Sequence, residues 1–241
     1  MRLFVLSGLA AAMTLTACSG GDGEADAKTP AGDAAASEVA TGADEASNAP
    51  RVVPAPEGSL AGEVMALGSP DAPLTIIEYA SLTCPGCAAF HVQILPEIKE
   101  KYIDTGKVRF EFREFPTDPQ NLAYAGFYLA RCAATQKGSS AYFAMIDTLF
   151  KRQRDWAYGP TPGETLEEIA AQAGISREAL QDCFFREEVK TAVAQNVTAG
   201  IEEHNVGVTP SFIVNDIAFD WGRSAEGMSN AIEAELAKLE Q

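Results

Sequence analysis

The sequence predicts an α/β fold built on one mixed sheet, and three observations carry this prediction. A run of β-prone residues at 74–79 gives way to helical periodicity, and a second strand pattern follows at 107–115. A long helical stretch begins near residue 121 and continues for about eighty residues. Two short strands and a final helix then fill residues 211–239. The expected order is therefore β-α-β, a helical block, and β-β-α.

Residues 1–17 have the layout of an export signal. Arg2 precedes the apolar run 3–15, which is too short to span a bilayer as a stable helix. The run ends in Leu-Thr-Ala-Cys18, which resembles the cleavage box of bacterial lipoproteins, in which the cysteine is acylated and becomes the new N-terminus. Acyl chains on Cys18 would anchor the protein to a membrane. Ser19, rather than aspartate, favours the outer membrane where the host has one; the alternative is an ordinary signal with an unmodified cysteine.

The segment 18–58 is dominated by Ala, Gly, Ser, Thr, Pro, Asp and Glu. Such a composition cannot bury enough apolar surface to offset the entropy of ordering the chain. We expect a flexible tether here and a folded domain over 59–241. No heptad pattern runs through the tether, so we expect a monomer.

The charge balance restricts the partners. The 241 residues include 34 acidic and 18 basic side chains, for a net charge of −16. This balance argues against nucleic acid and against anionic lipid surfaces as partners.

The most informative motif is Cys84-Pro85-Gly86-Cys87, which directly follows the first strand. Thr83 is a candidate N-cap for the next helix, which would place Cys84 in the first helical turn. Free backbone N–H groups and the helix dipole stabilise an anion there, so they lower the pKa of a thiol. A strand that leads into CxxC at a helix N-terminus is typical of a thiol–disulfide redox site.

The other elements follow from periodicity and turn residues. Pro96 should kink or break the helix after the CxxC because it lacks an N–H group. In 107–115, charged and apolar residues alternate, so Val108, Phe110, Phe112 and Glu114 should share one face. The remaining expected elements are an edge strand at 64–67, helices at 121–136, 139–156, 164–173, 177–187 and 189–205, strands at 211–214 and 217–221 joined by a turn at 215–216, and a helix at 224–239. This order is that of a thioredoxin fold with an all-helical insertion, approximately 119–203, after its second core strand.

Three sequence islands carry a resemblance to the DsbA-like family of exported thiol–disulfide oxidoreductases. They are EYASLTCPGCAAFH (78–91), VRFEFREFP (108–116) and GVTPSFIVND (207–216). The resemblance extends from Val64 to the C-terminus. It implies a catalysed exchange of disulfides in secreted proteins that contain cysteine, with a membrane redox partner of the DsbB or DsbD type. The two cysteines carry this chemistry, so no cofactor is expected.

The resemblance also implies roles for individual residues. Cys84 would be the exposed nucleophile and Cys87 the partly buried resolving thiol. Pro210 would be the cis-proline next to the CxxC, and Thr209 would offer its backbone to an extended substrate segment. A trans proline in an ordinary turn is the alternative.

An acidic residue six positions before the first cysteine, here Glu78, lies beneath the disulfide in this family and influences proton transfer to the resolving thiol. A buried carboxyl group suits a proton carrier, although an exposed strand face would make Glu78 a solvated charge. His91 lies on the same helix face as Cys87. It is interpreted as a packing or surface residue, with contact to the site or a metal as alternatives, and His204 has no evident role.

Cys132 and Cys183 fall in expected helices of the insertion. In an oxidising compartment they should form a structural disulfide, and some DsbA-like proteins have a second disulfide in this domain. The alternative is a zinc site shared with Cys84 and Cys87.

One position departs from the pattern of the family's strong oxidants, which have His between the two cysteines where this chain has Gly86. The pKa of Cys84 should then lie above the value of about 3.5 known for DsbA, yet below that of a free thiol. Thr209 also occurs in relatives that isomerise or reduce disulfides. A membrane-fed reductase or isomerase, and a non-catalytic metal-binding lipoprotein, are therefore the alternatives.

Overall fold

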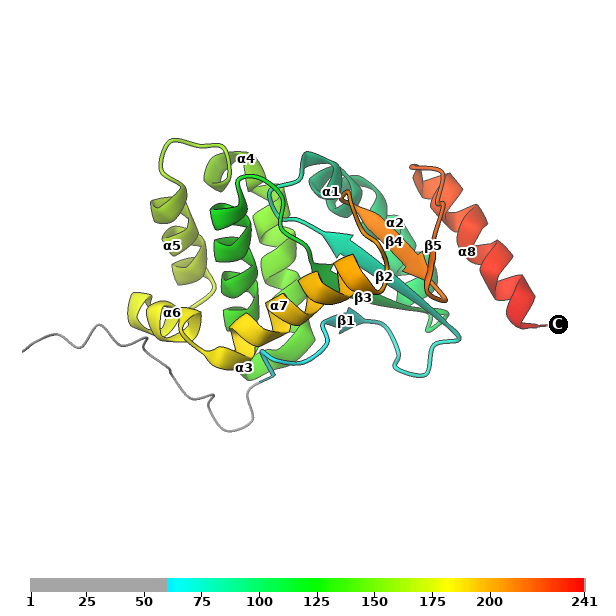
Figure 1. Ribbon diagram of the computed structural model, residues 1–241, viewed down its shortest axis with the longest axis horizontal. Helices are drawn as coiled ribbons and strands as arrows, with labels where there is room; N and C mark the ends of the chain where they lie inside the picture. The colour runs from blue at the N-terminus through cyan, green and yellow to red at the C-terminus, as the bar shows by residue number, and fades with distance from the viewer. Residues whose placement is uncertain (1–59, 241) are drawn as a thin grey trace, which may run out of the picture. The chain divides into compact units, whose positions relative to one another are not determined.

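The computed structural model describes residues 60–240. The expected export signal, the lipidation site Cys18 and the tether 18–58 lie outside the described residues. The described part contains one sheet with the strand order β1-β3-β2-β4-β5 (Figure 1). The strands are β1 (Ala66–Leu67), β2 (Leu74–Ala80), β3 (Val108–Glu114), β4 (Ser211–Val214) and β5 (Ile217–Ala218). β2 and β3 are parallel, whereas the other neighbouring strands are antiparallel.

The central strands have the expected alternation. Val108, Phe110, Phe112 and Glu114 on β3 are all buried, while the residues between them are half-buried. Because side chains alternate across a sheet, these four residues share one face. The neighbouring strand β2 is more fully buried, and both Glu78 and Tyr79 have no exposed surface. β2 is therefore covered on both faces.

The helix after the CxxC is interrupted, as Pro96 predicts. It runs as α1 (Pro85–Ala89), a π-helical turn (Phe90–Ile94), α2 (Leu95–Ile98) and a second π-helical turn (Lys99–Ile103). Pro96 lies in the first turn of α2, where its missing N–H removes a backbone hydrogen bond from the preceding turn.

The helical block follows β3. It consists of α3 (Gln120–Lys151), α4 (Gln153–Trp156), α5 (Pro162–Gln172), α6 (Arg177–Phe184) and α7 (Glu187–Glu202). The break expected near residue 138 is a kink inside α3, where Gly138 has φ 62° and ψ −150°. The expected helix 139–156 is thus the second part of α3 together with α4. The expected strand 217–221 is wrong in length, because β5 ends at Ala218.

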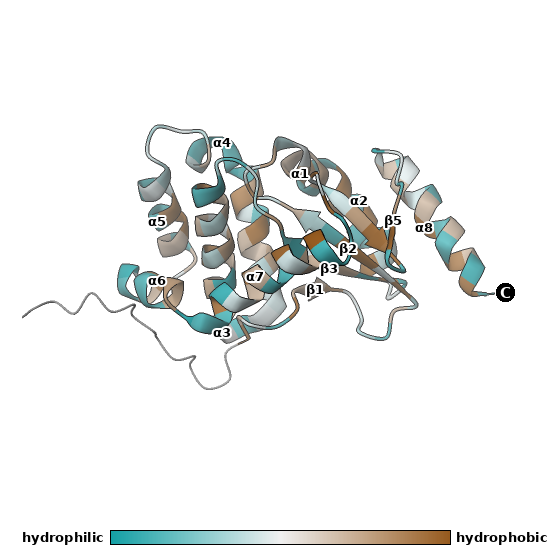
Figure 2. Cartoon of the chain, viewed as in Figure 1, coloured by the Kyte–Doolittle hydropathy of each residue, from teal (hydrophilic) through white to brown (hydrophobic). Residues whose placement is uncertain are grey.

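Helices cover both sides of the sheet (Figure 1). α7 packs against β3, and α8 (Ala225–Leu239) packs against α2. Both helices carry apolar and polar residues along their length (Figure 2). Met228 and Ile232 of α8 are fully buried in the main core. A smaller apolar cluster contains Tyr79, Val206 and Ile213.

A buried ion pair joins the sheet to the helical block. Glu114, at the end of β3, forms two hydrogen bonds with Arg131 of α3, with N–O distances of 2.7 and 3.0 Å. Tyr142 and Asn196 also donate to this carboxylate. Burial favours a raised pKa for Glu114, but the charge and hydrogen bonds of Arg131 outweigh it and hold the pKa below its ordinary value.

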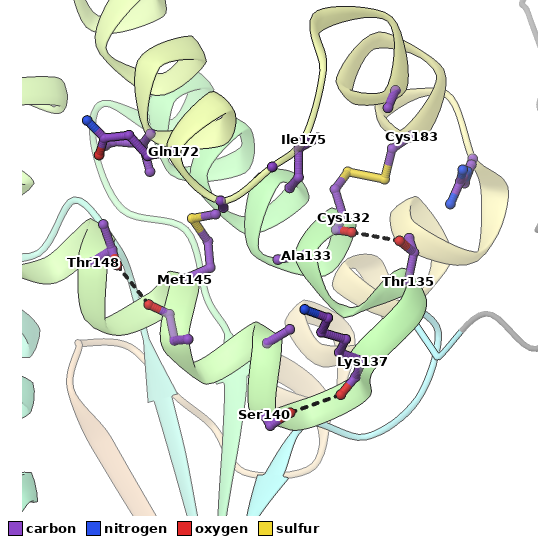
Figure 3. A pocket seen from close by; sticks show the side chains of 17 residues that line it. Cys132, Ala133, Thr135, Lys137, Ser140, Met145, Thr148, Gln172, Ile175 and Cys183 are labelled. Atoms are coloured by element: carbon purple, nitrogen blue, oxygen red, sulfur yellow. Dashed lines mark hydrogen bonds between the residues drawn. A yellow bond between two sulfur atoms is a disulfide. The ribbon is translucent and has the colours of Figure 1, made fainter.

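The helical block also contains a disulfide between Cys132 of α3 and Cys183 of α6. It lies beside a cavity of about 790 Å³ that is lined by residues of the helical block, among them Met145, Ile175 and the disulfide itself (Figure 3). Because Cys132 and Cys183 are bonded to each other, the four-cysteine zinc site considered above is wrong.

Replacing both Cys132 and Cys183 by serine should lower the free energy of unfolding by about 4 kcal/mol, since the bond closes a loop with a sequence separation of 51. Guanidinium unfolding at neutral pH would measure the loss. The redox behaviour of Cys84 and Cys87 should stay unchanged. A stability equal to that of the unsubstituted chain would contradict this role.

Candidate active site

Cys84 lies at the junction between β2 and α1. Its backbone is extended, with φ −82° and ψ 121°, and it is the N-cap residue of α1. The expectation that Thr83 is the N-cap is therefore wrong. Thr83 instead donates its hydroxyl to the carbonyl of Thr117, at 2.9 Å, and the helix begins one residue later than expected.

Side chains of the helical block hold the loop that carries Cys84. The amide nitrogen of Gln153 donates to the carbonyls of Leu82 and Cys84, at 2.8 and 3.0 Å. The hydroxyl of Tyr158 donates to the carbonyl of Thr83. Sequence reasoning missed Gln153 and Tyr158, because single polar residues about seventy positions away from the CxxC form no motif with it.

The loop at residue 210 lies against the cysteines. The Thr209–Pro210 peptide bond is cis, and the sulfur of Cys84 lies 3.4 Å from the carbonyl oxygen of Thr209. An ideal Cβ on Gly86 would lie 3.4 Å from Cδ of Pro210 and 3.7 Å from the sulfur of Cys84. A side chain at position 86 would therefore contact both groups. The Asp118–Pro119 bond, for which no role was expected, is also cis.

The pKa values of the two thiols are shifted in opposite directions. The pKa of Cys84 is lowered from 9.0 to about 5, chiefly by a hydrogen bond from Cys87, with further contributions from Thr209 and from the backbone of Cys87 and Gly86. The pKa of Cys87 is raised well above 9.0, chiefly by burial and also by Cys84 and the charge of Glu78. At neutral pH, Cys84 is a half-buried thiolate and Cys87 a buried thiol.

Glu78 and His91 meet beneath the cysteine pair. Nε2 of His91 lies 2.7 Å from Oε2 of Glu78, and both side chains are buried. The solvated alternative for Glu78 is therefore wrong. The interpretation of His91 as a packing residue is incomplete, since its ring packs against aromatic residues and also binds the carboxylate.

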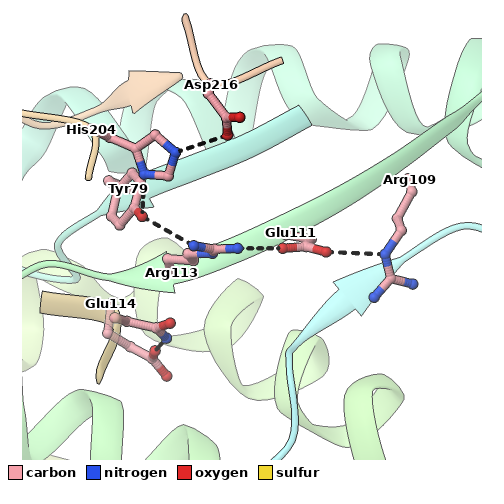
Figure 4. Close-up of polar contacts among 8 residues, drawn as sticks. Tyr79, Arg109, Glu111, Arg113, Glu114, His204 and Asp216 are labelled. Atoms are coloured by element: carbon pink, nitrogen blue, oxygen red, sulfur yellow. Dashed lines mark hydrogen bonds and ion pairs between the residues drawn. The ribbon is translucent and has the colours of Figure 1, made fainter. Parts of the chain in front are cut away.

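His204 belongs to a different polar network (Figure 4). Its Nδ1 lies 2.9 Å from the hydroxyl of Tyr79, which also accepts a hydrogen bond from Arg113 at 3.2 Å. Glu111 joins Arg113 to Arg109 through two further hydrogen bonds. This network includes neither cysteine of the CxxC.

Two features bear on the alternative functions. Within residues 60–240, no three or more His, Cys, Asp or Glu side chains come together in a group that could hold a metal ion. In the same range, no helix combines the length and hydrophobicity that a membrane span requires.

The arrangement has the groups that thiol–disulfide exchange requires. A stabilised thiolate is half-exposed, a second thiol is close enough to donate a hydrogen bond to it, and a carboxyl group lies near the second thiol. The thiolate can attack a disulfide, and the second thiol can then attack the mixed disulfide that results.

Comparison with known proteins points to the same chemistry. A sequence model of the family described as Thioredoxin matches residues 61–234. A Rickettsia conorii protein provisionally named a protein-disulfide oxidoreductase is 33% identical over 178 residues, which are 73% of this chain and 62% of that protein. The chain thus spans less than two thirds of the length of this relative. The disulfide bond formation protein D of Bacillus subtilis is 26% identical over 70% of this chain and 76% of its own length.

Among solved structures, the chain is similar to alpha-DsbA1 of Wolbachia pipientis. The TM-score is 0.65 with 28% sequence identity, over 73% of this chain and 92% of the other. This similarity confirms the thioredoxin-like fold with a helical insertion.

Alkylation of the reduced protein by iodoacetamide should show a midpoint near pH 5 for Cys84, because only the thiolate reacts. Mass spectrometry of rapidly quenched samples would follow the modification at each pH. In Cys87→Ala the midpoint should rise, since the largest stabilising hydrogen bond is lost. A midpoint close to that of a free thiol in the unsubstituted chain would contradict the described electrostatics.

Proposed function

Because the chain belongs to the thioredoxin family and has its DsbA-like form, we propose that it is a protein thiol–disulfide oxidoreductase that forms or exchanges disulfides in other proteins. The observation that carries this proposal is the difference in protonation between the two cysteines. Cys84 is a thiolate with a pKa of about 5, whereas the buried Cys87 beside it is protonated. The similarity to the disulfide bond formation protein of B. subtilis supports the direction of disulfide formation.

In this direction the reaction begins from the Cys84–Cys87 disulfide. A substrate thiolate attacks the sulfur of Cys84, the Cys84–Cys87 bond breaks, and Cys87 leaves with the electron pair. A second substrate thiolate then attacks the substrate sulfur of the mixed disulfide, which releases Cys84 as a thiolate. The low pKa of Cys84 makes it a good leaving group, so this second step favours a disulfide in the substrate.

Thr209 and Pro210 serve as the candidate substrate-binding loop. Both residues are half-buried beside Cys84, while the preceding Val208 is 70% exposed. An extended substrate segment could pair with the backbone of this loop and bring its cysteine to the sulfur of Cys84.

The N-terminal sequence supports the proposed location. The apolar run 3–15 and the box that ends at Cys18 support export and lipid anchoring in the cell envelope, with the outer membrane favoured where one exists. The substrates would then be secreted proteins with unpaired cysteines. A membrane redox partner would renew the Cys84–Cys87 disulfide.

The oxidised protein should form disulfides in a reduced, unfolded substrate such as ribonuclease A, and Cys84→Ser should reduce this activity to the background rate. The regain of ribonuclease activity would measure the reaction. The Cys132→Ser/Cys183→Ser variant, kept below its unfolding temperature, is the matched control and should remain active. Full activity of Cys84→Ser would reject the proposal.

A further inference from the structure

The buried pair of Glu78 and His91 has a geometry that neither packing nor the CxxC motif accounts for. The two side chains come from β2 and from the π-helical turn after α1, and their exposed fractions are 0% and 4%. Burying an ionisable pair is costly unless its geometry is good. We propose that His91 is a positioning residue that holds Glu78 as the proton-transfer group for Cys87; this inference rests on the proposed redox function.

Aromatic rings fix the orientation of the imidazole. Phe150 of α3 stacks on His91 with ring centroids 4.3 Å apart, and Phe90 and Phe112 meet its ring edge-to-face at 5.5 Å each. With the ring held in this way, Nε2 is directed at Oε2 of Glu78. The histidine therefore fixes one oxygen of the carboxyl group in a single arrangement.

The other oxygen of Glu78 remains available. Oε1 is buried and has no hydrogen-bond partner among the described residues, which is costly for a carboxyl oxygen in the absence of a transient partner. Glu78 is also close enough to Cys87 for its charge to act on that thiol. Oε1 of Glu78 can thus exchange a proton with the thiol of Cys87.

Other polar groups near this site are bonded elsewhere, so His91 is the residue that can position Glu78. Tyr142 of α3 is close enough to Glu78 for the charge of that carboxyl group to raise its pKa, but its hydroxyl donates to Glu114. Arg131 is bound to Glu114 in turn. From α1, Cys87 is the titratable group on which the charge of Glu78 acts. Among the described residues, His91 is the group with an ion-pair contact to Glu78.

The reaction then requires that Cys87 receive a proton. When a substrate thiolate attacks Cys84, the S–S bond to Cys87 breaks and Cys87 receives the electron pair. Burial disfavours a thiolate there. One proton of the Glu78–His91 pair passes through Oε1 of Glu78 to the sulfur of Cys87, which leaves the pair with one proton fewer. During reoxidation the same proton returns from Cys87 to Glu78.

A double-mutant cycle on the full chain tests the proposal. The variants are His91→Gln, Glu78→Gln and the two combined. The rate constant for reduction of the Cys84–Cys87 disulfide by reduced glutathione would be measured between pH 5 and 9 by acid quenching and mass spectrometry. Dividing each rate constant by that of the unsubstituted chain removes the ionisation of glutathione. We expect each single variant to be slower by about tenfold or more, with a pH-dependent ratio, and the double variant to be no slower than Glu78→Gln.

His204→Gln is the matched control, because it makes the same substitution at the other histidine of the chain, which binds Tyr79 and belongs to a network that includes neither cysteine of the CxxC. It should retain the pH profile of the unsubstituted chain. A pH-independent ratio for His91→Gln, with effects that add to those of Glu78→Gln, would overturn the positioning role. Failure of the proposed function would look different, because the Cys84–Cys87 disulfide of the unsubstituted chain would then exchange with glutathione at no pH.

A second measurement remains decisive if His91→Gln does not fold. The chain contains two histidines, so ¹⁵N NMR with His204→Gln as a reference assigns the signal of His91. The ¹⁵N shifts of the His91 ring at pH 7 should differ between the oxidised and reduced protein, and Glu78→Gln should abolish this difference. Ring shifts independent of the redox state would overturn the proposal.

Discussion

The buried carboxylate of Glu114 is the group on which the arrangement of the described structure depends. A carboxylate without exposed surface must be compensated by charge and hydrogen bonds. Arg131 supplies the charge and also donates to the carbonyls of Ala61 and Glu63, at 2.7 and 2.9 Å. The segment before β1, the end of β3 and helix α3 therefore meet at one ion pair, to which Asn196 adds α7. This arrangement fixes the helical block against the sheet.

The geometry of the CxxC depends on this placement, because Gln153 and Tyr158 reach the loop from the helical block. β2 brings the chain to Cys84 from one side, and the block holds the loop carbonyls from the other. The thiolate of Cys84 can then face the Thr209–Pro210 loop while Cys87 is buried. The difference in environment between two thiols that are three positions apart thus arises from contacts that span most of the folded chain.

Sequence reasoning could predict what depends on local pattern. The alternation in β3, the strand before the CxxC, the interruption at Pro96 and the helical block each follow from side-chain periodicity or from backbone chemistry. The contacts of Gln153 and of the Glu78–His91 pair could not be predicted in the same way, because they depend on how elements pack in three dimensions. The N-cap was misplaced at Thr83 because the residue that precedes the helix is Cys84, whose side chain forms no capping hydrogen bond. A pattern of capping side chains cannot find an N-cap that does not use its side chain.

Stabilisation of the Cys84 thiolate favours the reduced protein and makes the Cys84–Cys87 disulfide oxidising. The most direct test is the reduction potential of the Cys84–Cys87 pair, equilibrated against glutathione at pH 7. A pKa of about 5 for Cys84 predicts a potential above the value of about −270 mV for thioredoxin, and Gly86 should keep it below the value of about −120 mV for DsbA. A potential at or below that of thioredoxin would contradict the account.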